Sequence, residues 1–210
     1  MSILQVCRQV ACCGFVVSSL LSAAPLAVCA DTTAIEEDWQ LDLLTPNAIR
    51  SSPQLNCLIA STGNTASYYA VLLINQRANQ GGGMVLQLWE GTNLLDSSEL
   101  SLYQSLATPN ERINWTTRME LSSNGVLTVQ ILSGTSTTWD KFGGRTELLV
   151  STQTSLQYLN AYSPDTSTSS SGVEFGHPRV NKLMLRKVRV YTSNKKSVEQ
   201  ALDRVVFQYK

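Results

Sequence analysis

Acidic residues are the side chains that could do chemistry most simply here, because a pair of carboxylates can hydrolyse a glycosidic bond. Such a pair must lie about 5 to 10 Å apart, and residues at i and i+2 of one β-strand share a face. The acids at 36–38 are contiguous, so neighbours should point to opposite faces. The other candidates are isolated in the sequence: Glu90, Glu120, Asp140, Glu147 and Glu174. The sequence therefore predicts no catalytic residue, although two isolated acids could still meet in space.

Nucleophilic and zinc chemistry also lack their usual residues. His177 is the only histidine, and Cys57 is the only cysteine beyond residue 30. A serine triad needs a histidine near a Gly-x-Ser-x-Gly turn, which does not occur, and structural zinc needs several His or Cys ligands. Cys57 is flanked by leucine and isoleucine, so we expect a buried apolar side chain. His177 precedes Pro178 and is expected to be structural, with a ligand contact at the rim as the alternative.

Aromatic rings are the remaining candidates, because saccharides stack their apolar faces on exposed tryptophan and tyrosine side chains. Trp115 falls on the apolar face of an alternating segment and is expected in the core. Trp89 shares a face with Val85 and Gln87, where the core is favoured over a binding platform. The carbohydrate-binding candidates are Tyr68, Trp89, Tyr158, Tyr162 and His177.

The first thirty residues differ from the rest of the chain. They carry Arg8 as their only charge and end in Val28-Cys29-Ala30 after a long apolar segment, a pattern typical of a cleaved signal peptide. We predict a signal peptide at 1–30 and a secreted or periplasmic protein. The alternatives are an N-terminal membrane anchor and a lipoprotein attached through Cys29. No other long apolar segment follows, so no membrane span is expected after removal of the signal.

Length and charge limit the classes of function. Residues 31–210 suit one domain with a substantial core. Sixteen acidic and sixteen basic residues balance, so no global field recruits nucleic acid. The charges are nevertheless uneven, because residues 31–42 hold five acids and no base, whereas residues 179–196 hold seven bases and no acid.

Alternating segments between turn signals predict an all-β fold. Strands are expected at 68–77, 84–90, 94–102, 113–122, 126–132, 136–142, 147–152, 155–161 and 182–191. Asn124-Gly125 predicts a two-residue hairpin and Ser133-Gly134 a further turn. Residues 163–172 form a polar loop. Because no long helical pattern interrupts the strands, the sequence favours an antiparallel sandwich.

The C-terminal segment is the exception to this pattern. Residues 31–196 are expected to form the domain, with 197–210 as an extension. Ser197 and Gln200 fit a capping box, and apolar residues recur at helical spacing, which predicts a short helix: Val198, Ala201, Leu202, Val205 and Val206. A final strand over 204–209 is the alternative.

Two segments resemble concanavalin A-like jelly rolls of the lectin and glucanase superfamily, laminin G-like modules included. They are 114–142 ("NWTTRMELSSNGVLTVQILSGTSTTWDKF") and 171–191 ("SGVEFGHPRVNKLMLRKVRVY"). The resemblance spans most of 36–192 and implies an antiparallel jelly-roll β-sandwich with ligands on the concave face or rim, and Trp139 in the core. Glucanases of this fold carry Glu-x-Asp-x-Glu on one strand and lyases carry Gln-x-His. Neither motif occurs here.

The resemblance also implies a calcium site, for which Asn160 and Asp165 are the candidates, although residues 163–166 read equally well as a turn. In this fold the first and last strands pair. The acids of 36–42 would then face Arg186, Lys187 and Arg189, each opposite pair contributing about 0.2 to 1 kcal/mol. This pairing is favoured over a docking strip for an anionic polymer. A break in alternation at 186–187 predicts a β-bulge.

The sequence therefore favours a secreted or periplasmic, non-enzymatic jelly-roll domain that binds a polysaccharide or other glycan. A hydrolase or lyase with dispersed catalytic residues is one alternative. An envelope structural or protein-interaction module is the other. No cofactor beyond calcium is suggested.

Overall fold

The computed structural model describes residues 31–47, 52–75, 83–101, 106–144, 147–194 and 196–209. The predicted signal peptide lies outside the described residues, as do the last residues of the strands predicted at 68–77 and 94–102. None of the helices in the described part of the chain has the length and hydrophobicity required to span a bilayer.

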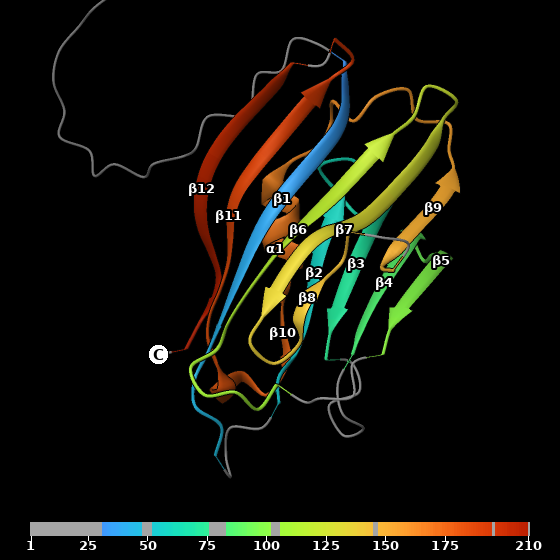
Figure 1. Cartoon of the computed structure of the whole chain (residues 1–210). Helices are drawn as coiled ribbons and strands as arrows, with labels where there is room; N and C mark the ends of the chain where they lie inside the picture. Colours follow the sequence, from blue (N-terminus) through green and yellow to red (C-terminus); the bar gives the residue numbers. More distant parts are fainter. Residues whose placement is uncertain are drawn as a thin grey trace, which may run out of the picture.

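Two antiparallel sheets stack face to face (Figure 1). The seven-stranded sheet has the order β12 (Ser197–Gln208), β11 (Val180–Thr192), β1 (Thr32–Leu43), β6 (Arg112–Leu121), β7 (Val126–Ser136), β8 (Asp140–Phe142), with β9 (Leu149–Gln153) also paired to β7. The five-stranded sheet has the order β10 (Gly172–Phe175), β2 (Gln54–Ala60), β3 (Tyr68–Ile74), β4 (Met84–Glu90), β5 (Asn93–Leu100). This arrangement confirms the all-β sandwich expected from the alternating segments.

The core fills the space between the sheets, and strand alternation decides which residues enter it. On β1 the core-facing side chains of Ile35, Trp39 and Leu41 are at most 2% exposed. The residues that alternate with them point to the outer face. Trp39 packs parallel to its cross-strand partner Trp115, with ring centroids 6.1 Å apart. Trp139 is also buried. The core positions expected for Trp115 and Trp139 are therefore confirmed.

Helix α1 (Pro164–Ser170) is short and begins where a polar loop was expected. Ser163 caps it by accepting a hydrogen bond from the Asp165 N–H, and Pro164 occupies the first turn, where its missing N–H costs nothing. The helix packs on β2 and also contacts β11 and β12, so it fills the side of the sandwich between the two sheets (Figure 1). A 3₁₀ turn, His177–Arg179, connects β10 to β11.

The C-terminal segment is a strand, so the helix predicted at 197–210 is wrong and the alternative strand is correct. β12 pairs with β11 from Ser197 to Gln208. Asp203 takes a left-handed φ of 47°, and the register shifts twice along this pair. Bulges interrupt the two-residue alternation, and the resulting apolar spacing imitates a helical one.

Two further turn assignments differ from the structure. At the β6–β7 hairpin Gly125 is the residue with a left-handed backbone, and its N–H donates to the Ser122 carbonyl. This geometry is a type I turn followed by a bulge, not the predicted two-residue turn. Ser133 and Gly134, predicted as a turn, lie inside β7. One predicted strand also differs, because residues 155–161 form a loop.

The seven-stranded sheet bends along a line of bulges. Arg186 is skipped where β11 pairs with β1 and with β12, which confirms the bulge predicted at 186–187. The β6–β7 register shifts at the same level, between Thr116 and Thr117. Because each bulge adds local twist and bend, aligned bulges curve the whole sheet. Figure 1 shows this curvature in the long strands.

The close contact between Gly134 and Phe142 supplies a test of this packing. A Cβ on residue 134 would lie 2.1 Å from the buried Phe142 ring, so Gly134→Ala should lower the free energy of unfolding by about 1 to 3 kcal/mol. Gly63→Ala is the control, because its Cβ would meet nothing closer than 3.8 Å. Urea unfolding of both variants measures the difference, and equal stabilities would contradict the contact.

Candidate functional site

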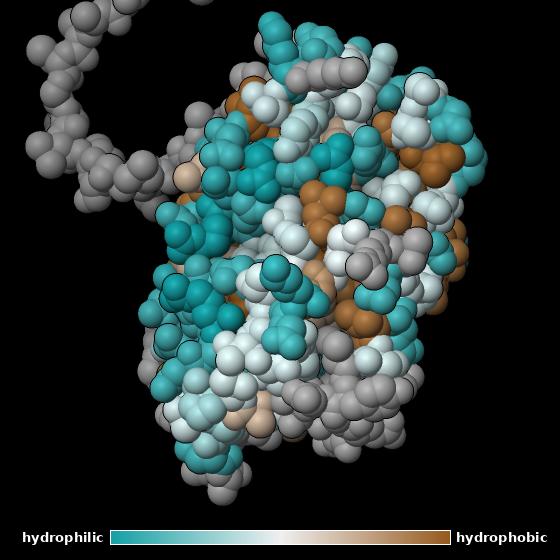
Figure 2. All heavy atoms as spheres, viewed as in Figure 1, coloured by the Kyte–Doolittle hydropathy of each residue, from teal (hydrophilic) through white to brown (hydrophobic). Residues whose placement is uncertain are grey.

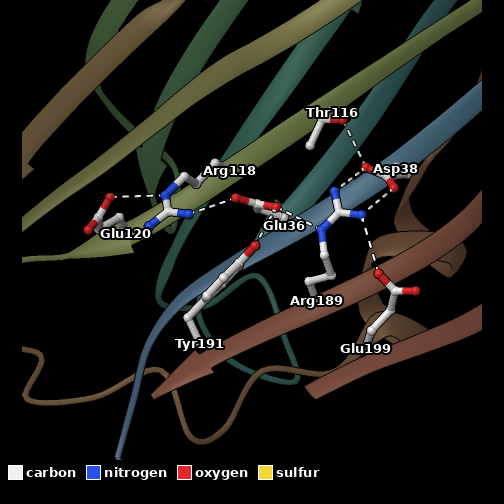
Figure 3. Close-up of polar contacts among 8 residues, drawn as sticks. All are labelled: Glu36, Asp38, Thr116, Arg118, Glu120, Arg189, Tyr191 and Glu199. Carbon is white, nitrogen blue, oxygen red and sulfur yellow. Dashed lines mark hydrogen bonds and ion pairs between the residues drawn. The ribbon is translucent and has the colours of Figure 1, made fainter. Parts of the chain in front are cut away.

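The outward face of β1 carries a network of charged side chains at the centre of the seven-stranded sheet (Figure 3). Glu36 lies between its register partners Arg118 on β6 and Arg189 on β11. Strand alternation brings Asp38 to the same face, while Glu37 points into the core, as the contiguous acids predicted. The predicted pairing of the acidic first strand with the basic closing strand is confirmed.

Arg189 binds two of the outward acids of β1, Glu36 and Asp38. Its Nε lies 2.8 Å from Glu36 Oε2, and its two terminal nitrogens each lie 2.7 Å from an oxygen of Asp38. This bidentate geometry is the strong form of an arginine–carboxylate pair. The Thr116 hydroxyl also donates to Asp38 at 2.8 Å. Asp38 is therefore fully occupied by neighbouring strands.

Arg118 bridges Glu36 and Glu120. Its Nη1 lies 2.7 Å from Glu36, its Nε lies 3.0 Å from Glu120, and its guanidinium carbon lies 5.0 Å from the centre of the Tyr191 ring. Tyr191 donates its hydroxyl to Glu36 at 2.9 Å. The hydrogen bonds of Arg118 to described residues use its Nε and Nη1. We call Glu36, Asp38, Arg118, Glu120 and Arg189 the ion-pair network.

The network lowers the pKa of Glu36. Burial alone would raise the pKa of Glu36, but hydrogen bonds from Arg189, Arg118 and Tyr191 outweigh it and lower that pKa. Burial, and next the bond to Glu36, raises the pKa of Tyr191. A general acid must hold a proton near neutral pH, and a phenolate base must lose one. Glu36 and Tyr191 therefore suit positioning and binding rather than proton transfer.

A groove of about 870 Å³ adjoins the network where β1 begins and β6 and β11 end. Arg118 and Glu120 belong to both features, and Tyr191, which donates to Glu36 of the network, also lines the groove. Hydroxyl and amide groups dominate the remaining lining: Ser122, Ser123, Asn124, Gln153, Gln157 and Ser193. Figure 2 shows hydrophilic residues gathered over the β12, β11 and β1 part of this face. Such a lining offers many hydrogen-bond donors and acceptors in a shallow polar site.

Of the aromatic candidates, Tyr158 alone lines this groove. Its side chain is 46% exposed, and it stands on the 154–163 loop beside Tyr191, which sequence reasoning did not select. Tyr162 instead turns inward and donates its hydroxyl to the buried Glu37 at 2.8 Å. Tyr191 lies at an outward position near the end of β11, next to the basic residues. That position is the feature of the sequence that could have identified Tyr191 as a groove residue.

Trp89 and Tyr68 lie on the other sheet. The core face of β4 carries Met84, Leu86 and Leu88, so the core position favoured for Trp89 is wrong. Its ring is partly exposed on the outer face and stacks on Tyr69, with centroids 6.5 Å apart. Tyr68 packs against the core, and a hydrogen bond to Glu90 raises the pKa of its phenol.

The remaining candidates are separated from the groove. His177 is exposed in the 3₁₀ turn, with its ring 5.5 Å from Phe207. Asn160 accepts a hydrogen bond from the Thr32 N–H at 2.7 Å, and Asp165 is paired with Arg204. The structure thus gives both proposed calcium ligands protein partners. Among the described residues, no three His, Cys, Asp or Glu side chains gather into a metal-binding set.

Comparisons with known proteins give similarities of fold only. No protein-family model matches the chain, and no curated protein matches its sequence. Solved structures similar to it include alginate lyase Aly36B, with a TM-score of 0.35 and 10% identity over 64% of this chain and 65% of that one. A variant of that lyase in complex with an alginate tetrasaccharide gives the same values.

A second similar structure is scytalido-glutamic peptidase with a transition state analog inhibitor, with a TM-score of 0.34 and 14% identity over 82% of each chain. Our chain spans slightly less than two thirds of the alginate lyase's length. No family model and no related sequence supports the resemblance to the lectin and glucanase superfamily, so the antiparallel β-sandwich is the part of that expectation that the structure bears out. The function is therefore argued from the groove itself.

The ion-pair network makes a testable contribution to stability. Arg189→Met should lower the free energy of unfolding by about 2 kcal/mol, because it leaves the carboxylates of Glu36 and Asp38 partly buried without their cation. Arg112→Met removes a matched pair with Asp42 in which the arginine side chain is 62% exposed, and should cost less than about 1 kcal/mol. Chemical denaturation would measure both, and equal losses would show that the network adds nothing beyond a surface pair.

Proposed function

We propose that this protein is an exported, non-catalytic β-sandwich domain that binds a saccharide chain in the groove on the seven-stranded sheet. The observation that carries the proposal is the lining of that groove, in which the exposed Tyr158 ring stands among amide and hydroxyl side chains. A ring can stack on the apolar face of a sugar while amides bond its hydroxyls. Export is inferred from the signal-peptide pattern at 1–30.

The charge of the groove favours a hydroxyl-rich saccharide over a densely anionic polymer. Arg118 is the groove's cation, and it is already paired with Glu36 and Glu120. A polyanion would have to compete with these carboxylates. The Arg118 guanidinium can still donate to a sugar hydroxyl or ring oxygen.

The enzymatic alternative finds less support in the same geometry. A hydrolase needs two carboxyl groups beside its substrate, one of which keeps its proton near neutral pH. Among the described residues that line the groove, Glu120 supplies the carboxyl group, whereas Glu37, whose pKa is about 7, is fully buried and does not line it. A lyase that uses a tyrosine base needs a phenol that deprotonates readily, whereas the pKa of Tyr191 is raised.

A binding experiment tests the proposal directly. Glycan arrays and affinity electrophoresis with residues 31–210 should identify a retained saccharide, and calorimetry should then give its affinity. Tyr158→Ala should weaken binding roughly tenfold, the value of one aromatic contact. Tyr209→Ala is the control, because that ring is 42% exposed but does not line the groove.

Three outcomes would contradict the proposal. Absence of retention on every neutral and acidic polysaccharide would remove saccharide binding. Release of reducing ends, or of unsaturated products that absorb in the ultraviolet, would establish the enzymatic alternative instead. Equal effects of the Tyr158 and Tyr209 substitutions would place the binding site elsewhere on the molecule.

A further inference from the structure

A buried carboxylate lies directly beneath the loop that carries Tyr158. Glu37 of β1 points into the molecule and is 0% exposed. Oε1 accepts hydrogen bonds from the Tyr162 hydroxyl at 2.8 Å and from the Ser167 hydroxyl at 2.5 Å. Oε2 accepts one from the Trp39 indole N–H at 2.9 Å. The carboxyl group thus joins β1, the loop and helix α1.

All three of these donors are uncharged. An ionised Glu37 would therefore be a buried charge with no cation in contact, and such burial is unfavourable. This burial raises the pKa of Glu37 to about 7, although its three hydrogen bonds act in the opposite direction.

The other buried titratable groups around Glu37, Cys57 and Tyr162, stay neutral near pH 7. Burial raises the pKa of Cys57 on β2 and of Tyr162 well above their ordinary values, and Glu37 adds to both shifts. Arg204 on β12 is the cation on this side, and it is paired with Asp165 of α1. Glu37 is therefore the group of this set whose charge changes near pH 7.

The loop above Glu37 forms one wall of the groove. Residues 153–158 line that wall, and Tyr158 is followed at once by its anchors. The Leu159 N–H donates to the Thr32 carbonyl at 2.8 Å, and the Thr32 N–H donates to the Asn160 side chain at 2.7 Å. Tyr162 adds the bond to Glu37. The position of Tyr158 thus depends on contacts within four residues of it.

We propose that Glu37 is a positioning residue of the groove, whose protonated form holds residues 154–170 against β1, so that Tyr158 becomes less well fixed as the pH rises through neutrality. The role of Tyr158 in binding rests on the proposed function. The attachment of the segment to β1 does not.

Proton linkage gives the direction in which pH changes the closure of residues 154–170. When the segment opens, water reaches Glu37 and its pKa returns towards the ordinary value of 4.5, so the closed form binds more protons between pH 4.5 and about 7. Each pH unit in that window weakens closure by up to about tenfold, and closure is constant below and above it. Acid therefore favours the closed segment.

Hydrogen exchange of the 154–170 amides at pH 5.5 and pH 8 tests the attachment without any ligand. Glu37→Gln keeps the size of the side chain and, like the protonated acid, offers one acceptor oxygen and one donor group, but it cannot ionise. The wild-type exchange rate divided by the Glu37→Gln rate at the same pH cancels intrinsic base catalysis. This ratio should rise at least tenfold from pH 5.5 to pH 8. An unchanged ratio would overturn the proposal.

Two further variants keep the test decisive. Glu111→Gln removes another buried carboxylate, which accepts hydrogen bonds from Ser136 and Thr138, and should leave the pH dependence of this segment intact. Tyr162→Phe removes one donor that lowers the pKa of Glu37 and should move the opening to higher pH, so it serves if Glu37→Gln fails to fold. An unmoved opening pH in Tyr162→Phe would also overturn the proposal.

A saccharide identified by the array supplies the second measurement. Its affinity for the wild-type protein should fall between pH 5.5 and pH 8, while its affinity for Glu37→Gln stays constant. If no saccharide binds at either pH, the proposed function fails while the exchange ratio still decides the role of Glu37. If binding is present but pH-independent in both proteins, the groove stands and Glu37 has no positioning role.

Discussion

The placement of three consecutive acids on a central strand is the constraint on which the rest of the structure depends. β1 has a hydrogen-bonded neighbour on both sides, so its residues must alternate strictly between the core and the outer face. Glu36 and Asp38 consequently meet arginines of the adjacent strands, while Glu37 must be satisfied from within the sandwich. The outward acids thus contact β6 and β11, and Glu37 contacts the 154–163 loop and helix α1. Together these contacts position the elements around the groove.

The curvature of the seven-stranded sheet follows from a second constraint, the aligned bulges. Arg186 is the extra residue where β11 pairs with β1, Leu202 and Asp203 lie opposite it where β11 pairs with β12, and the β6–β7 pair shifts register at the same level. A flat sheet would leave the outer face without a hollow, whereas the bend supports a groove of about 870 Å³ at one end and a smaller one of about 280 Å³ at the bulges. The smaller hollow is lined by Asp38, Asn114, Thr116 and Arg186 among others.

Much of this architecture could be predicted from local patterns. Alternation over 113–122 identified β6 almost to the residue, and the opposite charges at the two ends of the chain identified the pairing of β1 with β11. The wrong predictions concern segments in which the backbone interrupts the two-residue alternation or in which a glycine serves packing. A left-handed Asp203 and two register shifts gave β12 an apparently helical spacing. Gly134 resembled a turn residue, but its role is to leave room for Phe142.

The site was less predictable because it is made by long-range pairs. Tyr158 could be selected as a surface aromatic, although its segment was predicted to be a strand. Nothing near Tyr162 in the sequence indicates a partner 125 residues away. Trp89 shows the same limit on a strand, since alternation groups it with Val85 and Gln87 without saying which face of the sheet is buried. Periodicity shows which side chains of a strand share a face, and only the tertiary packing shows which of the two faces is buried.

Glu36 and Glu37 show why residue type alone does not determine the chemistry of such a site. They are adjacent and identical, yet the cations around Glu36 lower its pKa and the uncharged cavity around Glu37 raises its pKa. The floor of the groove is therefore held by charge pairs and its wall by a nearly neutral hydrogen-bonded cluster. Salt screens exposed pairs much more than buried ones, so ionic strength acts mainly on the floor. Protons act mainly on the wall, because Glu37 changes charge near pH 7 while Glu36 stays ionised. The two conditions thus act on the same groove through separate parts of one strand.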